Sequence, residues 1–560
     1  EIEGQKGVLK NSAQDLLNIL KLSDKIELMA DKLYVYAKMR RDEDNRKNKY
    51  QVLYDRAETL AIEVGSALSY IVPEIISIPE AELEGFVKEN EELKLYKHLI
   101  DELLRQKKHI LSPAEEKILA MVADISFAPS NIFSMLNNAD IKFPIIKDEN
   151  GEEVELTKGR YGRFMESDNR EVRRAAYKAM YSSYDKLINT IGTTLGSSVK
   201  KDIFYARTRK YDSALESALD QDNVTVEVYD RLIETVHNNL DKMYKYMDIR
   251  KKLLKLDDLH MYDLYVPLIK DVEMKIPYEK AKDLLIDGLQ PLGKEYLAKL
   301  EEGLNSGWID VYENEGKTSG AYSWGSYSSH PYILLNYDNK LNDAFTLAHE
   351  MGHSMHTYYS NTSQPYVYSQ YSIFVAEVAS TVNESLLIDH MINNAKDERE
   401  KAYLINHYLE QFRGTVYRQT MFAEFEKIIH AEVEKGEALT PESLSSIYTD
   451  LNKLYFGENV VLDDEIAIEW ARIPHFYSAF YVYKYATGFS AATSLKEQIL
   501  KEGEPAVNRY IDFLKAGSSD YPLNVLKKAG VDLTKPEPVQ EALDYFGRLV
   551  DELEKLVNNM

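Results

Sequence analysis

The chain has 560 residues, of which 44% are apolar and 29% are charged, a composition typical of a soluble globular protein. Its formal net charge of −24 repels nucleic acid and anionic membranes, so neither is expected as a partner. The absence of cysteine excludes disulfides, thiolate nucleophiles and cysteine-ligated metal sites, and it suits a cytoplasmic location. Residues 1–10 lack the apolar core of a signal peptide, and no run of about 18 apolar residues predicts a membrane-spanning helix.

Most of the chain is predicted to be helical, because apolar residues recur at three- and four-residue spacing among charged ones. Clear examples are residues 12–39, 114–121 and 171–187. We expect Ser167 or Asp168 to cap the N-terminus of the last of these helices.

Two stretches interrupt the helical pattern, and a third marks a candidate boundary. A proline and an Asp-Glu-Asn-Gly run predict a small hairpin within residues 143–156. Residues 189–198 are rich in Thr, Gly and Ser and are the best candidate for a boundary between two regions. We expect an N-terminal helical region at 1–190 and a catalytic region at 191–560. Residues 316–337 combine Gly, Ser and Tyr and end in an apolar run, which predicts a loop leading into a buried or edge strand.

The most informative motif is His349-Glu350-Met351-Gly352-His353, which follows the pattern HExxH. Positions four apart on a helix differ by about 400° of rotation, so His349 and His353 project from one face and can hold one zinc at about 2.0–2.1 Å. Glu350 lies on the flank of that face, where its carboxylate can activate a water for attack on a carbonyl. The alternative is a pair of helix histidines without a metal.

Two residues compete as the third ligand. His356 lies about 10.5 Å along the helix axis from His349, too far for one ion to reach both, so a supporting or structural role is expected. Glu377 follows His353 by 24 residues, enough for a second helix to pack antiparallel, and its apolar neighbours make it look buried. A metal would supply the partner that a buried acid needs. Glu384, seven residues later on the same face, is expected to orient a ligand histidine.

These segments resemble a known family. The HEMGH motif, followed 24 residues later by Glu-Val-Ala-Ser-Thr, resembles the thimet-oligopeptidase family of zinc metallopeptidases, and most closely its oligoendopeptidase F branch. Residues 472–488 are similar to the C-terminal signature of that branch, and residues 319–323 with Asn336 to its substrate-side loop and strand. The resemblance covers about residues 157–547.

The resemblance implies a mainly α fold, a helical ellipsoid with a deep substrate channel and a small β-sheet beside the HExxH zinc site. Narrow access then implies that short peptides are cut and folded proteins are spared. The resemblance assigns one Zn²⁺ per chain to His349, His353 and Glu377. It makes Glu350 the general base, and His475 with one or two tyrosines of the C-terminal signature the groups that stabilise the oxyanion.

The choice of tyrosine is narrowed by spacing. Tyr477, Tyr481 and Tyr485 recur every four residues and would form one stripe on a helix, with Tyr483 facing away. A phenol can donate a hydrogen bond to developing negative charge, although core packing explains each tyrosine equally well. We favour Tyr477 and Tyr485 and leave the choice among the three open.

The substrate-side segment has its own signal. Gly320 and Gly325 lack side chains and allow an extended peptide to approach the backbone, and an exposed strand edge would bind it by β-addition. We expect Gly320 and Tyr322 to contact substrate, with Trp324 altering the side-chain preference near the cut. An ordinary surface loop is the alternative.

The sequence therefore predicts a zinc endopeptidase for short peptides. An aminopeptidase or carboxypeptidase with the same zinc chemistry is the first alternative. It would need a clamp for a terminal charge, for which Arg472 is one option. A non-catalytic helical peptide-binding protein is the second alternative, but it would not need Glu350 as a base. The sequence does not set the oligomeric state.

Overall fold

The structure is a computed structural model that describes residues 1–269, 272 and 274–559. Helices make up 72% of it, which confirms the predicted mainly α class, and the described strands form three small sheets. The chain divides into two compact units, each assembled from three separate segments. In the labels below, η marks a 3-10 or π helix.

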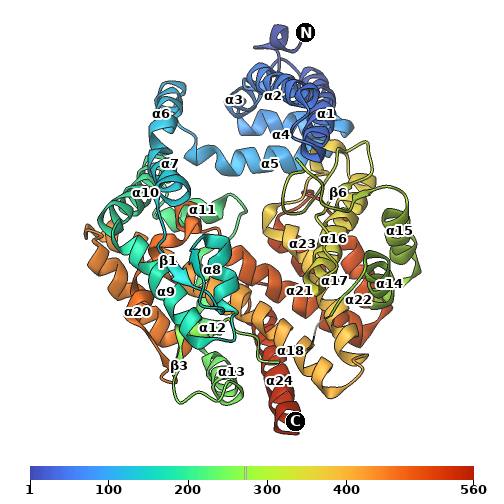
Figure 1. Cartoon of the computed structure of the whole chain (residues 1–560). Helices are drawn as coiled ribbons and strands as arrows, with labels where there is room; N and C mark the ends of the chain where they lie inside the picture. The colour runs from blue at the N-terminus through green and yellow to red at the C-terminus, as the bar shows by residue number, and fades with distance from the viewer. Residues whose placement is uncertain (270–271, 273, 560) are drawn as a thin grey trace. The chain divides into compact units, whose positions relative to one another are not determined.

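Unit 1 comprises residues 1–110, 274–390 and 495–531. Its first segment, blue in Figure 1, contains η1 (Ile2–Gln5), α1 (Ala13–Glu43), α2 (Asn48–Leu68), α3 (Ile71–Ser77), α4 (Glu80–Glu89), η2 (Glu91–Tyr96), α5 (Lys97–Gln106) and η3 (Lys107–His109). Its second segment contains α14 (Tyr278–Gly288), η6 (Gln290–Leu292), α15 (Gly293–Asn305), β4 (Ile309–Asp310), β5 (Tyr322–Trp324), β6 (Tyr332–Leu334), α16 (Leu341–Ser363), η7 (Tyr366–Tyr368) and α17 (Ile373–Asn393). Its third segment contains the end of α21 (Tyr483–Glu502), α22 (Glu504–Lys515) and α23 (Pro522–Lys528).

Unit 2 comprises residues 111–273, 391–494 and 532–560. Its first segment contains α6 (Pro113–Ser126), α7 (Ala128–Met135), η4 (Leu136–Asp140), β1 (Ile145–Lys147), β2 (Glu153–Glu155), α8 (Lys158–Met165), α9 (Arg170–Asp185), α10 (Ile188–Thr208), α11 (Ala214–Asp220), α12 (Val226–His237), α13 (Leu240–Leu253), β3 (Leu259–His260) and η5 (Met261–Asp263). Its other elements are α18 (Glu398–Phe412), η8 (Arg413–Tyr417), α19 (Arg418–Lys435), α20 (Pro441–Phe456), β7 (Val460–Val461), η9 (Asp464–Arg472), η10 (Pro474–Tyr477), the start of α21, and α24 (Glu537–Asn559).

Residues 189–198, where the sequence suggested a boundary, lie inside the continuous helix α10. Gly192 allows close packing in this stretch, because a Cβ there would lie 3.2 Å from Pro441 Cγ. The division of the chain into regions 1–190 and 191–560 stays a prediction. The antiparallel pair β1–β2 lies within residues 143–156, where a hairpin was expected.

The small sheet of unit 1 has the strand order β4-β6-β5. The predicted strand near residues 332–335 is β6, and it is the central strand, parallel to β4 and antiparallel to β5. Among the described strands β5 pairs only with β6, with Ser323 opposite Ile333, so it is an edge strand. Trp324 at the end of β5 packs edge-on against Tyr34 of α1, with ring centroids 5.9 Å apart.

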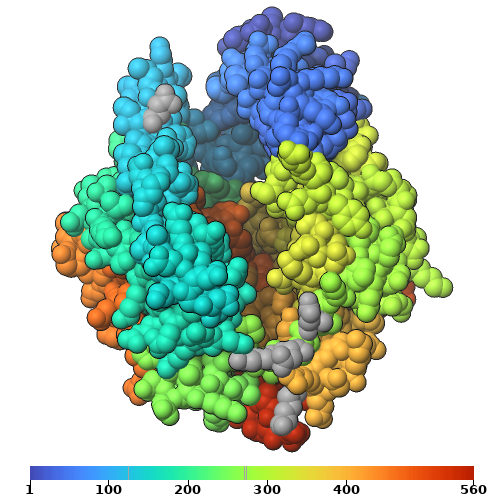
Figure 2. Space-filling model, viewed as in Figure 1, coloured from blue at the N-terminus to red at the C-terminus, as the bar shows by residue number. Residues whose placement is uncertain are grey.

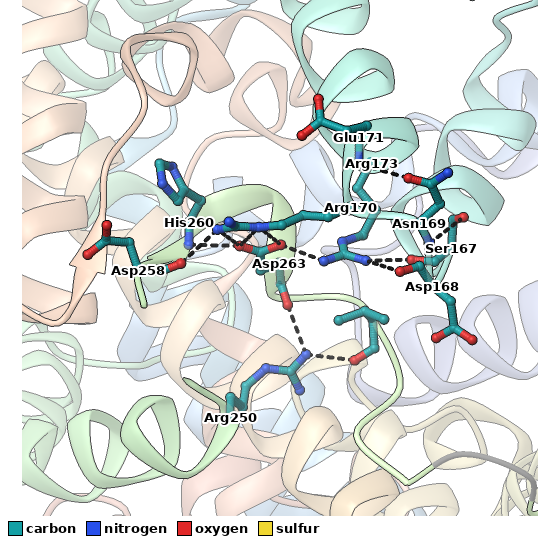
Figure 3. A network of polar contacts seen from close by, with 11 residues as sticks. Ser167, Asp168, Asn169, Arg170, Glu171, Arg173, Arg250, Asp258, His260 and Asp263 are labelled. Carbon is teal, nitrogen blue, oxygen red and sulfur yellow. Dashed lines mark hydrogen bonds and ion pairs between the residues drawn. The ribbon is translucent and has the colours of Figure 1, made fainter. Parts of the chain in front are cut away.

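The N-terminus of α9 is fixed by a buried ion-pair network in unit 2 (Figure 3). Asn169 caps the helix by accepting a hydrogen bond from the Glu171 N–H, so the expected caps, Ser167 and Asp168, are wrong. The carbonyl oxygens of both of those residues instead accept hydrogen bonds from the Arg173 guanidinium, which turns the chain away from the helix end.

Asp263 of η5 is the centre of the same network. It is fully buried and accepts hydrogen bonds from Arg170 Nη2 at 2.9 Å and Arg173 Nη2 at 2.6 Å, while its carbonyl oxygen binds Arg250 Nη2 at 3.2 Å. Removing one partner of such a buried pair costs about 3–5 kcal/mol, because an uncompensated charge is left behind. The network therefore ties α9, η5 and α13 together.

Two helical stretches pass a length-and-composition test for a membrane span, although neither is an unbroken run of apolar residues. Residues 48–77 and 113–140 each contain an 18-residue window with a mean hydropathy of 1.4. One or two such helices are weak support for a membrane span. The light-blue helices α6 and α7 of the second stretch lie at the surface of unit 2 in Figure 2, and Met121 and Ile125 are 70% and 72% exposed.

Candidate active site

Helix α16 presents the two histidines of the HExxH motif on one face, as the four-residue spacing predicts. Their imidazole rings lie at 84° to each other with centroids 4.7 Å apart, and the two Nε2 atoms face each other at 3.1 Å. Both ring nitrogens thus point at the same small volume beside the helix.

Helix α17 supplies the carboxylates, and Gly352 of the motif lets it approach. A Cβ on Gly352 would lie 2.5 Å from Ser380 Cα and 2.8 Å from the Ala379 carbonyl oxygen, so only glycine fits between the two helices. Contacts pair His349 with Glu384 and, one turn further along α16, Gly352 with Ser380. Residue numbers rise on one helix as they fall on the other, so the helices run antiparallel, as the sequence predicted.

Glu377 completes a group of three donor atoms that can hold a metal ion. Its Oε2 lies 3.3 Å from His349 Nε2 and 3.8 Å from His353 Nε2. Ligand atoms at 2.0–2.1 Å from a tetrahedral zinc are about 3.3–3.4 Å apart, so the three separations of 3.1–3.8 Å fit a zinc with its fourth position open. The Glu377 side chain is 39% exposed, less buried than expected from its apolar neighbours.

The other nitrogen of each imidazole is held by the protein. His349 Nδ1 lies 2.6 Å from Glu384 Oε1, so Glu384 occupies the predicted orienting position. Burial lowers the pKa of His349, but hydrogen bonds to Glu377 and Glu384 outweigh burial and raise that pKa to about 10 in the metal-free protein. Burial and the nearby charge of His349 lower the pKa of His353 to about 4, so His353 is neutral at pH 7.

Glu350 lies beside the donor group without belonging to it. It is 7% exposed, and burial raises the pKa of its carboxyl to about 7. The backbone N–H of Ser323 hydrogen bonds to Glu350, and Ser323 Oγ lies 2.8 Å from Ser354 Oγ. These two contacts fasten the edge strand β5 across α16 next to the proposed general base.

The residues expected to contact substrate lie in and before β5. Gly320 has a φ of 85°, which favours glycine, and its carbonyl oxygen accepts a hydrogen bond from Asn336 Nδ2 at 2.8 Å. The Tyr322 hydroxyl donates to Asp42 Oδ2 at 3.1 Å, so its side chain is anchored to α1. Gly325 differs from the expectation: a Cβ there would meet the His330 carbonyl oxygen at 3.1 Å, so its close approach is to its own loop.

His356 is not part of the donor group, as the helical rise predicted. It is fully buried and stacks on Tyr371 with ring centroids 3.6 Å apart and planes 4° apart. Burial lowers the pKa of His356 to about 3, so the ring is neutral. It packs as an aromatic side chain between Tyr371 and Phe513.

His475 and the three tyrosines belong to unit 2. His475 is half-buried, which lowers the pKa of its imidazole, and its ring lies 6.1 Å from that of Tyr485. The Tyr477 hydroxyl is buried and lies 2.7 Å from Thr194 Oγ1, while its ring stacks on Phe133. The Tyr477 side chain is thus held by contacts within unit 2.

The predicted stripe of three tyrosines on one helix is wrong. Tyr477 ends η10, Tyr481 lies in the irregular link after it, and Tyr485 lies in the first turn of α21. The helix cannot continue through the segment because Phe480 adopts a left-handed backbone with a φ of 58°.

Several site contacts were missed by sequence reasoning. They are the Ser323 N–H on Glu350, the anchor from Tyr322 to Asp42, and the hydrogen bond of 3.2 Å from Asn383 Nδ2 to the Ala348 carbonyl oxygen. These contacts join residues 27 to 280 positions apart and leave no periodic signal. The glycine inside the HExxH motif was the one available clue to the close approach of α17.

Fold and site together define a metalloendopeptidase. The sequence pattern of peptidase family M3 matches residues 163–545 and that of oligopeptidase F matches residues 74–143, so the chain belongs to peptidase family M3. It is 54% identical to the oligopeptidase PepF of Bacillus subtilis over 99% of this chain and 82% of that protein. It is 44% identical to the plasmid oligoendopeptidase F of Lactococcus lactis subsp. cremoris over 99% and 92% of the two chains.

Solved structures agree with this assignment. The crystal structure of oligoendopeptidase-F from Enterococcus faecium covers 100% of this chain and 96% of its own, with a TM-score of 0.78 and 39% identity. A crystal structure from Chlamydophila abortus covers 99% of this chain and 92% of its own, with a TM-score of 0.93 and 38% identity. The resemblance noted in the sequence is thus confirmed.

Proposed function

We propose that the protein is a zinc-dependent endopeptidase that hydrolyses internal bonds of short peptides, with one Zn²⁺ bound by His349, His353 and Glu377. The observation that carries the proposal is the group of three donor atoms within 4.8 Å of one another, with the buried Glu350 beside it. When bound, zinc supplies a Lewis acid that polarises a peptide carbonyl and lowers the pKa of water.

Glu350 performs the proton transfers. Its carboxylate accepts a proton from the attacking water and passes it to the leaving amine. Burial favours this role, because a carboxyl whose pKa lies near 7 exchanges protons readily at neutral pH. The Ser323 N–H holds the carboxylate in place from the strand side.

The edge strand β5 is the proposed binding surface for an extended peptide, which would add to the sheet through main-chain hydrogen bonds. Such binding tolerates many sequences. Gly320 and Tyr322 stay proposed substrate contacts, although the Tyr322 phenol is bonded to Asp42 and its backbone pairs with Leu334 of β6. The names of the relatives, oligopeptidase and oligoendopeptidase, support short peptides as the substrate class.

His475 and Tyr485 are the proposed donors to the oxyanion, by resemblance to the family signature. His475 is neutral at pH 7 and keeps an N–H to donate, and the Tyr485 ring lies next to it. Tyr477 stays a weaker choice because its hydroxyl is paired with Thr194. A cytoplasmic location stays a prediction.

We expect a peptide acetylated at its N-terminus and amidated at its C-terminus to be cut at the same internal bond, and within about 10-fold of the same kcat/KM, as its free-ended form. An endopeptidase binds main chain on both sides of the cut, whereas an exopeptidase requires a terminal charge. Mass spectrometry of the products distinguishes the two. Cleavage confined to the free-ended peptide would support the exopeptidase alternative.

Zinc binding is expected to release a proton from His349 at pH 8. The raised pKa of about 10 keeps this imidazole protonated in the metal-free protein, and its Nε2 must lose the proton to bind a metal. Calorimetric titration in two buffers of different ionisation enthalpy measures the number of protons released.

Glu384→Gln provides the matched control for proton release. It removes one of the two carboxylates that raise the pKa of His349, so fewer protons should be released. Any proton released by water when zinc binds is released in both proteins, so it cancels when the two proton counts are subtracted. Equal release by the two proteins would contradict the assigned state of His349.

A further inference from the structure

Phe480 has a strained backbone. Its φ of 58° lies in the left-handed region, which a bulky aromatic residue rarely adopts. Among the described residues, it is the only aromatic with a positive φ; the others apart from glycine are Lys210, Asn223, Lys255 and Asn339. Such a conformation persists only where the surrounding structure determines it, and it points to a functional constraint.

Two kinds of contact hold Phe480 in this conformation. Its backbone N–H donates to Glu426 Oε1 at 3.2 Å, in the interior of unit 2. Its ring packs against His430, with centroids 4.5 Å apart, and edge-on against Tyr229 at 6.0 Å. Phe480 is 2% exposed, and both its backbone and its ring are held by neighbouring side chains.

Glu426 is itself unusual. It is fully buried, burial raises its pKa well above the ordinary value, and its Oε2 has no hydrogen-bond partner. No cation pairs with its carboxyl among residues 1–269, 272 and 274–559, and the nearest charge recorded is the acid Asp202. A buried, unpaired carboxyl costs stability. The Glu426 carboxyl accepts its hydrogen bond from the N–H of Phe480, the residue with the strained backbone.

The turn at Phe480 determines how two site elements meet. η10 ends at Tyr477 and α21 begins at Tyr483, so the left-handed residue lies between them. The reversal places the His475 ring of one element 6.1 Å from the Tyr485 ring of the other, with their planes at 88°. A small change at the turn would separate these two rings.

We propose that Glu426 is a positioning residue for the oxyanion groups: its carboxyl holds Phe480 in the left-handed turn and thereby keeps His475 and Tyr485 together. This inference rests on the proposed roles of those two side chains. Glu426 lies on α19 and accepts its hydrogen bond from the Phe480 backbone, so it acts through backbone geometry.

Glu426→Met and Glu426→Leu remove the acceptor while keeping most of the side-chain volume. We expect kcat to fall about 10–100-fold with KM changed less than about threefold, because misplaced oxyanion donors affect the transition state more than substrate binding. Glu426→Gln keeps a carbonyl oxygen that accepts the Phe480 N–H, so its kcat should stay within about threefold of that of the parent protein. Zinc content should stay unchanged, because the proposed ligands belong to unit 1. Either acceptor-free variant suffices if the other fails to fold.

Thr420→Val is the matched control, since Thr420 is a buried residue of α19 whose hydroxyl lacks a hydrogen-bond partner. It should leave kcat unchanged. The proposal would be overturned if Glu426→Met and Glu426→Leu kept the kcat of the parent protein. It would also be overturned if Glu426→Gln lost as much kcat as they do, or if Thr420→Val did. His475→Ala and Tyr485→Phe are measured alongside. If His475→Ala and Tyr485→Phe keep the kcat of the parent protein, the assignment of the oxyanion donors is wrong. If these two variants lose kcat and the Glu426 variants do not, only the role of Glu426 is wrong.

Discussion

Glu350→Gln is expected to retain zinc at the level of the parent protein while its kcat for peptide hydrolysis falls about 10²–10⁴-fold. The amide keeps the size of the side chain and an oxygen that accepts the Ser323 N–H, so the local structure should persist. It cannot accept a proton from water at neutral pH. Steady-state hydrolysis together with elemental analysis of the dialysed protein measures both quantities.

Glu301→Gln is the matched control for this change. It makes the same substitution at an exposed position of α15 in the same unit, and it should leave both kcat and zinc content unchanged. If Glu350→Gln kept the kcat of the parent protein, the base would have to be another group. The mechanism proposed for Glu350 would then be wrong.

Glu377→Ala should have the second-largest effect, with loss of zinc binding and of hydrolysis together. The variant lacks one of three donor atoms and leaves two imidazoles that face each other at 3.1 Å. We expect its zinc affinity to fall by more than the 10–100-fold expected for Glu384→Gln, in which only the orientation of His349 is disturbed. Competition with a chromogenic chelator gives both affinities.

The order of the two affinities is the critical result. If Glu384→Gln lost more zinc affinity than Glu377→Ala, the assignments of ligand and orienting carboxylate would be exchanged. If Glu377→Ala bound zinc as tightly as the parent protein, the third ligand would be another residue. A normal circular dichroism spectrum is required of both variants.

The metal group was predictable because its geometry is almost entirely local. Two histidines four residues apart must share a face of any helix, and the rise of the helix excludes His356. Glu377 required one further assumption, that the next helix packs antiparallel, and Gly352 makes that approach possible. The position of Glu384 on the His349 ring then follows from a seven-residue step along the same helix.

The tyrosine stripe could not be corrected from the sequence. Left-handed turns are predicted from glycine, asparagine or aspartate, and Phe480 carries no such signal. Its conformation depends on Glu426, which lies 54 positions away in the chain. The hydrogen bond from Tyr322 to Asp42 joins residues 280 positions apart, so it could not be predicted from the sequence either. Long-range side-chain contacts of this kind have no period from which to predict them.

The central claim is that bound zinc, held by His349, His353 and Glu377, is required to cut an internal peptide bond. The most direct test is a titration of metal-free protein with zinc, followed by cleavage of a peptide blocked at both ends. We predict no cleavage without metal and a linear gain in rate that ends at one zinc per chain. Cleavage by the metal-free protein, or a zinc-loaded protein that leaves the blocked peptide intact, would contradict the account.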